Sequence, residues 1–197
     1  MTKITIIGSG YVGMSLAVLL SQIHETIIFD IDPQRVDLIN SNQSSVSDPL
    51  IQKYLEEKSL NLKATTDKKI AYGKSQYYII STPTNFDEKK NSFDTSIVES
   101  VIQDILLEDS KANIVIKSTI PIGFTEQMRK KFDSETIFFS PEFLREGYAL
   151  FDNLSPSRII IGPSSEKSKD FALILQEASS DKNSDIFIMS SEEAESV

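Results

Sequence analysis

The first twenty residues, MTKITIIGSGYVGMSLAVLL (residues 1–20), carry the pattern that decides the fold. A short apolar run at 4–7 is followed by three glycines and then by a second apolar run. The first run is typical of a buried strand, and the second is typical of a helix. In a turn between them, Gly8 permits the tight bend, Gly10 lets the backbone approach a pyrophosphate, and Gly13 lets the helix pack closely on the strand. The free N–H groups at the start of the helix then favour an anion.

An acidic residue closes the next apolar run and completes this pattern. Asp30 would accept hydrogen bonds from the ribose hydroxyls of an adenosine, and it would repel a 2′-phosphate. We therefore expect the cofactor to be NAD rather than NADP. Arg35, in the helix that follows, can accept a phosphate, and we interpret it as a neighbour of the ribose or adenine. The alternative is a tight turn that binds no ligand.

Composition excludes several other classes of partner. The chain has 197 residues, of which 40% are hydrophobic and 25% charged, and its net charge is −9. This charge argues against a nucleic acid or an anionic membrane surface as the main partner. No apolar stretch has the length of a membrane span, and the N-terminus lacks the pattern of a signal peptide. We expect a single cytoplasmic domain over residues 1–197.

The residue types that hold metals are scarce. The chain has no cysteine, which leaves no disulfide, thiolate metal ligand or cysteine nucleophile among these residues. Its single histidine, His24, has no second histidine beside it, and we expect a surface residue rather than a metal ligand or a base. No metal site is predicted.

Strand-like and helix-like segments alternate along the whole chain. Continuous apolar runs, typical of strands buried on both faces, predict strands. They lie at 3–7, 26–30, 62–65, 77–81, 114–117, 136–139, 158–161 and 186–189. Helical patterns lie at 12–22, 33–40, 49–58, 95–107, 125–132 and 166–178. This alternation predicts an α/β fold of the Rossmann-like, doubly wound kind, with a mostly parallel sheet and helices on both faces. Residues 82–94 are expected to form a polar loop without structure of its own.

Three of the predicted strands end in polar loops that contain proline. These loops lie at 81–84, 117–121 and 140–146. In an open α/β sheet, ligands bind beyond the carboxyl ends of the strands, where such loops would meet. Hydroxyl and carboxylate groups there suit a substrate rich in hydroxyl groups. Ordinary turn chemistry is the alternative for each loop taken alone.

Four segments together resemble a known family. They are GSGYVGMSLAVLL (8–20), STPTNFDEKKNSFDT (81–95), IKSTIPIGFT (116–125) and FFSPEFLREGYALFDNLSPSRIIIG (138–162). They resemble the N-terminal half of the UDP-glucose 6-dehydrogenases, within the UDP-glucose/GDP-mannose dehydrogenase family. The likeness extends over essentially the whole chain and is nearest to short bacterial enzymes of capsule synthesis. It implies oxidation of the C6 alcohol of UDP-glucose to UDP-glucuronate, with two NAD.

The resemblance also implies roles for individual residues. Those expected at NAD are Gly8, Gly10, Tyr11, Val12, Gly13, Asp30, Arg35, Thr84, Thr119 and Glu146. Those expected at the sugar nucleotide are Glu142, Phe143, Leu144, Arg145 and Glu146. Thr119 is expected to help hold a catalytic water. Glu146 is expected to be the base that activates this water, with Glu142 in support. A carboxylate suits this role if burial raises its pKa towards neutrality.

The family's cysteine nucleophile has no counterpart among these residues. The resemblance implies that the substrate-binding Lys and Asn, the dimer helix and the C-terminal UDP-binding domain also lie outside them. Ser190 and Glu193 form the pattern of a capping box, which predicts the start of a helix. We therefore expect the cofactor domain alone, with weak binding of UDP-glucose and no formation of UDP-glucuronate. The family forms a homodimer through the helix that is absent here, which makes a monomer plausible, and the sequence leaves the oligomeric state open.

Three alternatives remain open. The substrate of the family member could be GDP-mannose or a UDP-N-acetylhexosamine instead of UDP-glucose. The chain could also be a non-catalytic module that binds NAD or pairs with a full-length enzyme. A hydroxyacid-type dehydrogenase is the weakest alternative, because such enzymes usually rely on a catalytic histidine and His24 lies far from the polar loops.

Overall fold

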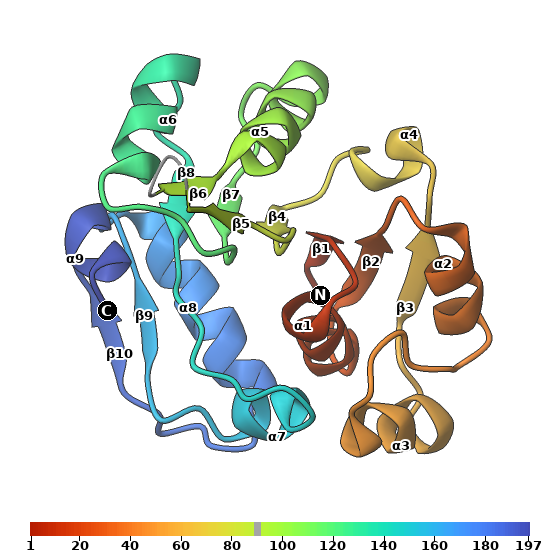
Figure 1. The fold of residues 1–197 in the computed structure, drawn as a ribbon. Helices are drawn as coiled ribbons and strands as arrows, with labels where there is room; N and C mark the ends of the chain where they lie inside the picture. Colours follow the sequence, from red (N-terminus) through yellow and green to blue (C-terminus); the bar gives the residue numbers. More distant parts are fainter. Residues whose placement is uncertain (89–91) are drawn as a thin grey trace.

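A six-stranded sheet forms the centre of the computed structural model, which describes residues 1–88 and 92–197 (Figure 1). Its strands are β1 (Lys3–Ile7), β2 (Glu25–Phe29), β3 (Leu62–Thr65), β4 (Tyr77–Ile80), β7 (Ile114–Ile116) and β8 (Ile137–Phe139). They lie in the order β3-β2-β1-β4-β7-β8, and every neighbouring pair is parallel. From β1 the chain adds strands first on one side (β2, β3) and then on the other (β4, β7, β8), so the strand order switches between β1 and β4. This switch confirms the doubly wound prediction and creates a crevice at that point.

Helices cover both faces of this sheet (Figure 1). Successive residues of β4 alternate between two hydrophobic clusters, because neighbouring side chains of a strand point to opposite faces. Tyr77 and Ile79 pack with α1 (Tyr11–Ser21), α3 (Pro49–Glu57), α7 (Ala149–Leu154) and α8 (Glu166–Ala178). Tyr78 and Ile80 pack with α5 (Ser96–Glu108), α6 (Phe124–Phe132) and α9 (Ser191–Glu195). Because both faces are buried, the strands are continuous apolar runs rather than alternating ones.

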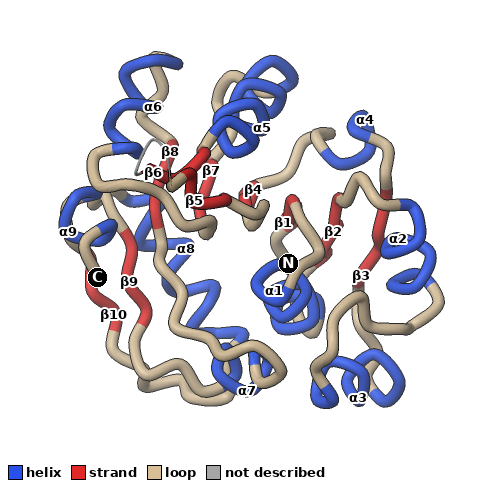
Figure 2. Tube along the Cα trace, in the orientation of Figure 1, coloured by secondary structure: helices blue, strands red, loops and turns tan. Residues whose placement is uncertain are grey.

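Most helices, drawn in blue in Figure 2, begin and end close to the predicted positions. They are α1 (Tyr11–Ser21), α2 (Pro33–Asn40), α3 (Pro49–Glu57), α5 (Ser96–Glu108), α6 (Phe124–Phe132) and α8 (Glu166–Ala178). The short helices α4 (Lys68–Ala71) and α7 (Ala149–Leu154) have no counterpart in the prediction, since a single turn carries too little periodicity to detect. No helix of the described residues is long and apolar enough to cross a membrane.

The last two predicted strands do form, but they do not extend the main sheet. β9 (Ile159–Ile161) and β10 (Ile186–Ile188) pair in parallel as a separate sheet. One antiparallel bridge, between Phe139 and Gly162, joins this sheet to β8.

The prediction of an unstructured loop at 82–94 is wrong. β5 (Asn85–Asp87) and β6 (Ser92–Asp94) pair antiparallel as a hairpin, and residues 89–91 lie outside the described part of the chain. The rings of Phe86 and Phe93 contact each other edge to face across the hairpin, with their centroids 5.3 Å apart and an angle of 73° between the ring planes. Such a cross-strand aromatic pair stabilises a short hairpin whose other residues are polar.

The prediction that His24 lies on the surface is also wrong. Its side chain is 5% exposed, and its Nδ1 accepts a hydrogen bond from the N–H of Thr2 at 3.4 Å. The turn after α1 folds the residue inwards, because the N–H of His24 donates to the carbonyl of Leu20. Burial lowers the pKa of His24, which favours the neutral ring. The residue lies next to the start of β2, at the opposite end of the strands from the glycine turn.

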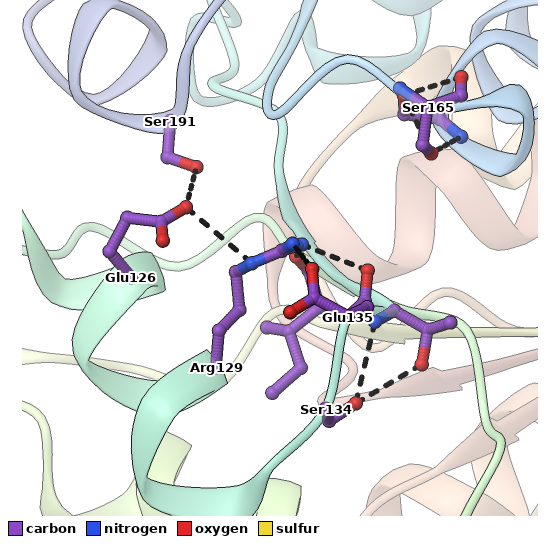
Figure 3. Close-up of polar contacts among 9 residues, drawn as sticks. Glu126, Arg129, Ser134, Glu135, Ser165 and Ser191 are labelled. Carbon is purple, nitrogen blue, oxygen red and sulfur yellow. Dashed lines mark hydrogen bonds and ion pairs between the residues drawn. The ribbon is translucent and has the colours of Figure 1, made fainter.

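The capping box predicted at residue 190 is confirmed, and the helix it starts, α9 (Ser191–Glu195), is fastened to α6. The carboxylate of Glu195 accepts hydrogen bonds from the N–H groups of Gly123 (2.6 Å) and Thr125 (2.8 Å) at the start of α6. The hydroxyl of Ser191 donates to Glu126, which also pairs with Arg129 (Figure 3). These contacts tie α9 to the face of the sheet that α6 covers.

Candidate functional site

The glycine turn between β1 and α1 is the most tightly constrained part of the crevice. Gly8 has a φ of +103°, and a Cβ there would lie 2.6 Å from the carbonyl oxygen of Ser81. A Cβ on Gly13 would lie 1.9 Å from the carbonyl oxygen of Gly8. Gly10 is different, because a Cβ there would meet no atom within 4 Å. The two crowded glycines are therefore required by packing, while Gly10 borders open space.

The start of α1 is free to receive an anion. Gly10 is the N-cap residue, and no side chain of residues 1–88 or 92–197 caps this end of the helix. The first N–H groups of a helix have no partner within the helix, and the helix dipole places partial positive charge beside them. Open space at Gly10 and an uncapped helix of 11 residues together fit a dinucleotide pyrophosphate.

Asp30, directly after β2, lies beside this turn. One of its carboxylate oxygens, Oδ2, accepts hydrogen bonds from the N–H of Ser9 at 2.8 Å and from its hydroxyl at 2.5 Å. The other, Oδ1, accepts from the N–H of Asp32 at 3.0 Å. Arg35 lies 3.9 Å from Asp30 and 3.8 Å from Asp32. The carboxylate is thus fixed at the place where the ribose of a dinucleotide is recognised in this fold.

A cavity of about 690 Å³ joins these parts to the ends of β4 and β7. Among its walls are the predicted residues Gly8, Gly10, Tyr11, Val12, Asp30, Arg35, Thr84, Thr119 and Glu142. Gly13 does not line it, since this residue is buried against the turn. The structure therefore brings most of the predicted cofactor residues together around one space, from four separate segments that follow β1, β2, β4 and β7.

A second cavity, of about 280 Å³, adjoins the first. Its walls include four predicted substrate residues, Glu142, Phe143, Leu144 and Arg145. Glu146 lines neither cavity, and its side chain is exposed. The guanidinium of Arg145 pairs with Asp152 at 2.7 Å, so its charge is already compensated.

Lys117 and Glu142 line both cavities. Lys117 follows β7, and its ammonium donates to the carbonyl of Pro141 at 3.1 Å. Burial lowers the pKa of Lys117 to about 8, although the charge of Glu142 opposes this change. Burial likewise raises the pKa of Glu142 to about 7, against the charge of Lys117. Two groups that each gain or lose a proton near neutral pH therefore lie where the cavities meet.

Glu142 is also short of hydrogen-bond partners. Its Oε2 atom is buried and has no partner within the described protein. An unsatisfied buried carboxylate oxygen is costly unless a ligand or water completes it. Glu142 is thus oriented to accept a hydrogen bond, or a proton, from a group within the cavities.

Sequence reasoning missed Ser9 and Lys117 as site residues. Both stand beside residues that it did select, Ser9 between two of the glycines and Lys117 two residues before Thr119. The position of Lys117 at a strand end was a usable signal, because its loop was expected at the crevice. The contact between Ser9 and Asp30 had no signal, since a hydroxyl inside a glycine turn has no fixed partner.

Comparison with known proteins identifies the family of this chain. The NAD binding domain model of the UDP-glucose/GDP-mannose dehydrogenase family matches residues 2–178. The chain is 46% identical over 197 residues to a UDP-glucose 6-dehydrogenase of Campylobacter jejuni. This alignment covers 99% of this chain and 50% of that protein. It is 51% identical over 167 residues to one from Streptococcus pneumoniae, covering 85% and 42% respectively.

A solved structure shows the same fold. A UDP-glucose dehydrogenase from the hyperthermophilic archaeon Pyrobaculum islandicum superimposes with a TM-score of 0.86 and 26% identity, over 99% of this chain and 48% of that one. The chain thus spans about half the length of the relatives it matches. It belongs to the UDP-glucose/GDP-mannose dehydrogenase family, whose NAD-binding domain it carries.

Proposed function

We propose that this chain supplies the cofactor half of a UDP-glucose 6-dehydrogenase. The observation that carries the proposal is the larger cavity, which the glycine turn, Asp30 and the ends of β4 and β7 share with Glu142. NAD, when bound, accepts a hydride from an alcohol of the substrate. The residues of this chain would hold the pyrophosphate at Gly10 and the start of α1, and the adenosine ribose at Asp30.

The smaller cavity supports a place for the sugar beside the cofactor. It adjoins the larger cavity through Lys117 and Glu142, and Phe143 and Leu144 supply its apolar wall. A hydroxyl placed at this junction would lie between a proton acceptor and the cofactor space. UDP-glucose is the first candidate for the substrate, since both curated relatives described above are UDP-glucose 6-dehydrogenases. GDP-mannose or a UDP-N-acetylhexosamine is the second candidate.

We assign the role of base to Glu142 rather than to Glu146. General-base catalysis near neutral pH needs a carboxylate whose pKa has been raised, and which lies within reach of the reacting group. Glu142 is half-buried with its Oε2 atom fully buried, and this burial raises the pKa of the carboxyl to about 7. Glu146 is exposed outside both cavities. Thr119 lies on the wall of the larger cavity, where it would help to hold a water near Glu142.

The first test is a fluorescence titration of the chain with NADH. We expect saturable binding, because the glycine turn, the start of α1 and Asp30 are all present and folded. NADPH is the control, and it should bind more weakly because its 2′-phosphate meets the Asp30 carboxylate. Absence of NADH binding by a folded chain, judged by far-UV circular dichroism, would contradict the proposal.

The remaining functional expectations are proposals of the same kind. UDP-glucose added to this chain should bind weakly and should not reduce NAD, because these 197 residues contain no cysteine to carry the intermediate that the family resemblance implies. A cytoplasmic location, a part in capsule synthesis and dimerisation of the whole enzyme likewise stay predictions.

A further inference from the structure

We propose that Ser9 is a positioning residue that sets the preference of the cofactor cavity for NADH over NADPH. Ser9 occupies the variable position between Gly8 and Gly10, to which the glycine pattern itself gives no role. It acts through Asp30, whose carboxylate it holds in one orientation. The inference rests on the proposed binding of NAD and extends it to the choice between the two dinucleotides.

The hydrogen bonds around Asp30 leave its carboxylate little freedom. An ionised carboxylate offers about four acceptor sites. Ser9 fills two of them on Oδ2, through its N–H at 2.8 Å and its hydroxyl at 2.5 Å. The N–H of Asp32 fills a third, on Oδ1, at 3.0 Å. The remaining site, on Oδ1, is left for a ribose hydroxyl, and the carboxylate cannot turn without breaking bonds to Ser9.

Ser9 is itself held firmly. Its side chain is completely buried, so the hydroxyl cannot turn to solvent for a different partner. Its carbonyl accepts a hydrogen bond from the hydroxyl of Ser45 at 2.8 Å, and the N–H of the preceding Gly8 donates to the carbonyl of Phe29 at 2.8 Å. The backbone on both sides of the Ser9 hydroxyl is thus anchored to neighbouring segments.

The nearby cation explains why this orientation matters. Arg35 lies 3.9 Å from Asp30, and its side chain is 44% exposed at the edge of the larger cavity. Arginine is the side chain best suited to a phosphate group. With Asp30 fixed between Arg35 and the glycine turn, a 2′-phosphate meets a negative charge. If the carboxylate could turn away, Arg35 would be available to that phosphate.

The test is the variant Ser9→Ala, in which the dissociation constants of NADH and NADPH are both measured by fluorescence titration. NADH should bind more weakly, because Asp30 loses the hydrogen bond from the Ser9 hydroxyl and is held only by the N–H groups of residues 9 and 32. The affinity for NADPH should fall less than that for NADH, or rise. We expect the ratio of the NADPH constant to the NADH constant to fall about tenfold, which corresponds to about 1.4 kcal/mol. A purely structural role would weaken both ligands equally and leave the ratio unchanged.

Ser45→Ala is the matched control. It removes a hydroxyl bonded to the same turn without touching Asp30, so the ratio should stay at the wild-type value. The double variant Ser9→Ala with Asp30→Ala should have the same ratio as Asp30→Ala alone, because Ser9 acts only through Asp30. If Ser9→Ala does not fold, Ser9→Cys, with a weaker donor of similar shape, should give a smaller fall in the ratio.

The outcomes separate this inference from the proposed function. A wild-type chain that binds neither dinucleotide overturns the proposed function and this inference with it. A wild-type chain that prefers NADH, with an unchanged ratio in Ser9→Ala or Ser9→Cys, overturns only the role of Ser9. A fall in the ratio that is equally large in Ser45→Ala also overturns it.

Discussion

Gly13→Ala is expected to destabilise the domain by about 3 kcal/mol or more and to abolish NADH binding. The added Cβ would lie 1.9 Å from the backbone oxygen of Gly8, and no rotation of a side chain can relieve a clash with backbone. The helix α1 must then move away from β1, which disrupts the anion site at its start. Urea unfolding followed by circular dichroism measures the loss of stability, and NADH fluorescence measures the loss of binding.

Gly10→Ala is the matched control for this prediction. A Cβ at Gly10 meets no protein atom within 4 Å, and its φ is −73°, which any residue adopts. The free energy of unfolding should change by no more than about 1 kcal/mol. NADH binding should nevertheless weaken, because the methyl group occupies space that the pyrophosphate needs. Equal stability of Gly13→Ala and Gly10→Ala would contradict the packing described for this turn.

Lys117→Met is expected to raise the pKa of Glu142 above its value of about 7. The positive charge of Lys117 stabilises the ionised form of Glu142, so its removal favours the protonated form. Glu142 would then be ionised only at higher pH. In a whole enzyme carrying this change, the rise in activity that depends on ionised Glu142 should move to higher pH. Carbon-13 NMR of labelled glutamate carboxylates, recorded over a pH series, measures this pKa directly.

Lys111→Met provides the comparison, because Lys111 precedes β7 at the opposite end and is exposed. It removes one positive charge from the chain without changing the junction of the cavities, and the pKa of Glu142 should not move. The reciprocal variant Glu142→Gln should lower the pKa of Lys117 below about 8. A pKa of Glu142 that falls or stays constant in Lys117→Met would show that the two groups are not coupled.

The glycine turn and Asp30 could be predicted because each obeys a local rule. Gly8, Gly10 and Gly13 stand at a fixed spacing between an apolar strand and an apolar helix, and Asp30 directly follows the next strand. Continuous apolar runs likewise identified the strands, since both faces of the sheet are buried. Both signals are properties of short segments, and the sequence contains them in full.

Features that depend on distant contacts were harder to predict. His24 is buried by packing under the start of the chain, and the hairpin at 85–94 depends on one pair of facing rings. The β9–β10 sheet is joined to β8 by the bridge between Phe139 and Gly162, two residues that lie far apart in the sequence. In the site, the raised pKa of Glu142 results from burial, which the sequence does not show, and the family resemblance therefore led us to expect the exposed Glu146 as the base.

The most direct test of the cofactor site is a nitrogen-15 NMR titration of the chain with NADH. The account predicts that the amide signals of Ser9, Gly10, Tyr11 and Val12 shift most, together with that of Thr119 across the larger cavity. Amides of β10, which lie outside this cavity, should remain unchanged. Saturable shifts confined to the first group would support the site as described. Binding of NADH that leaves the glycine turn unshifted, and moves other amides instead, would contradict it.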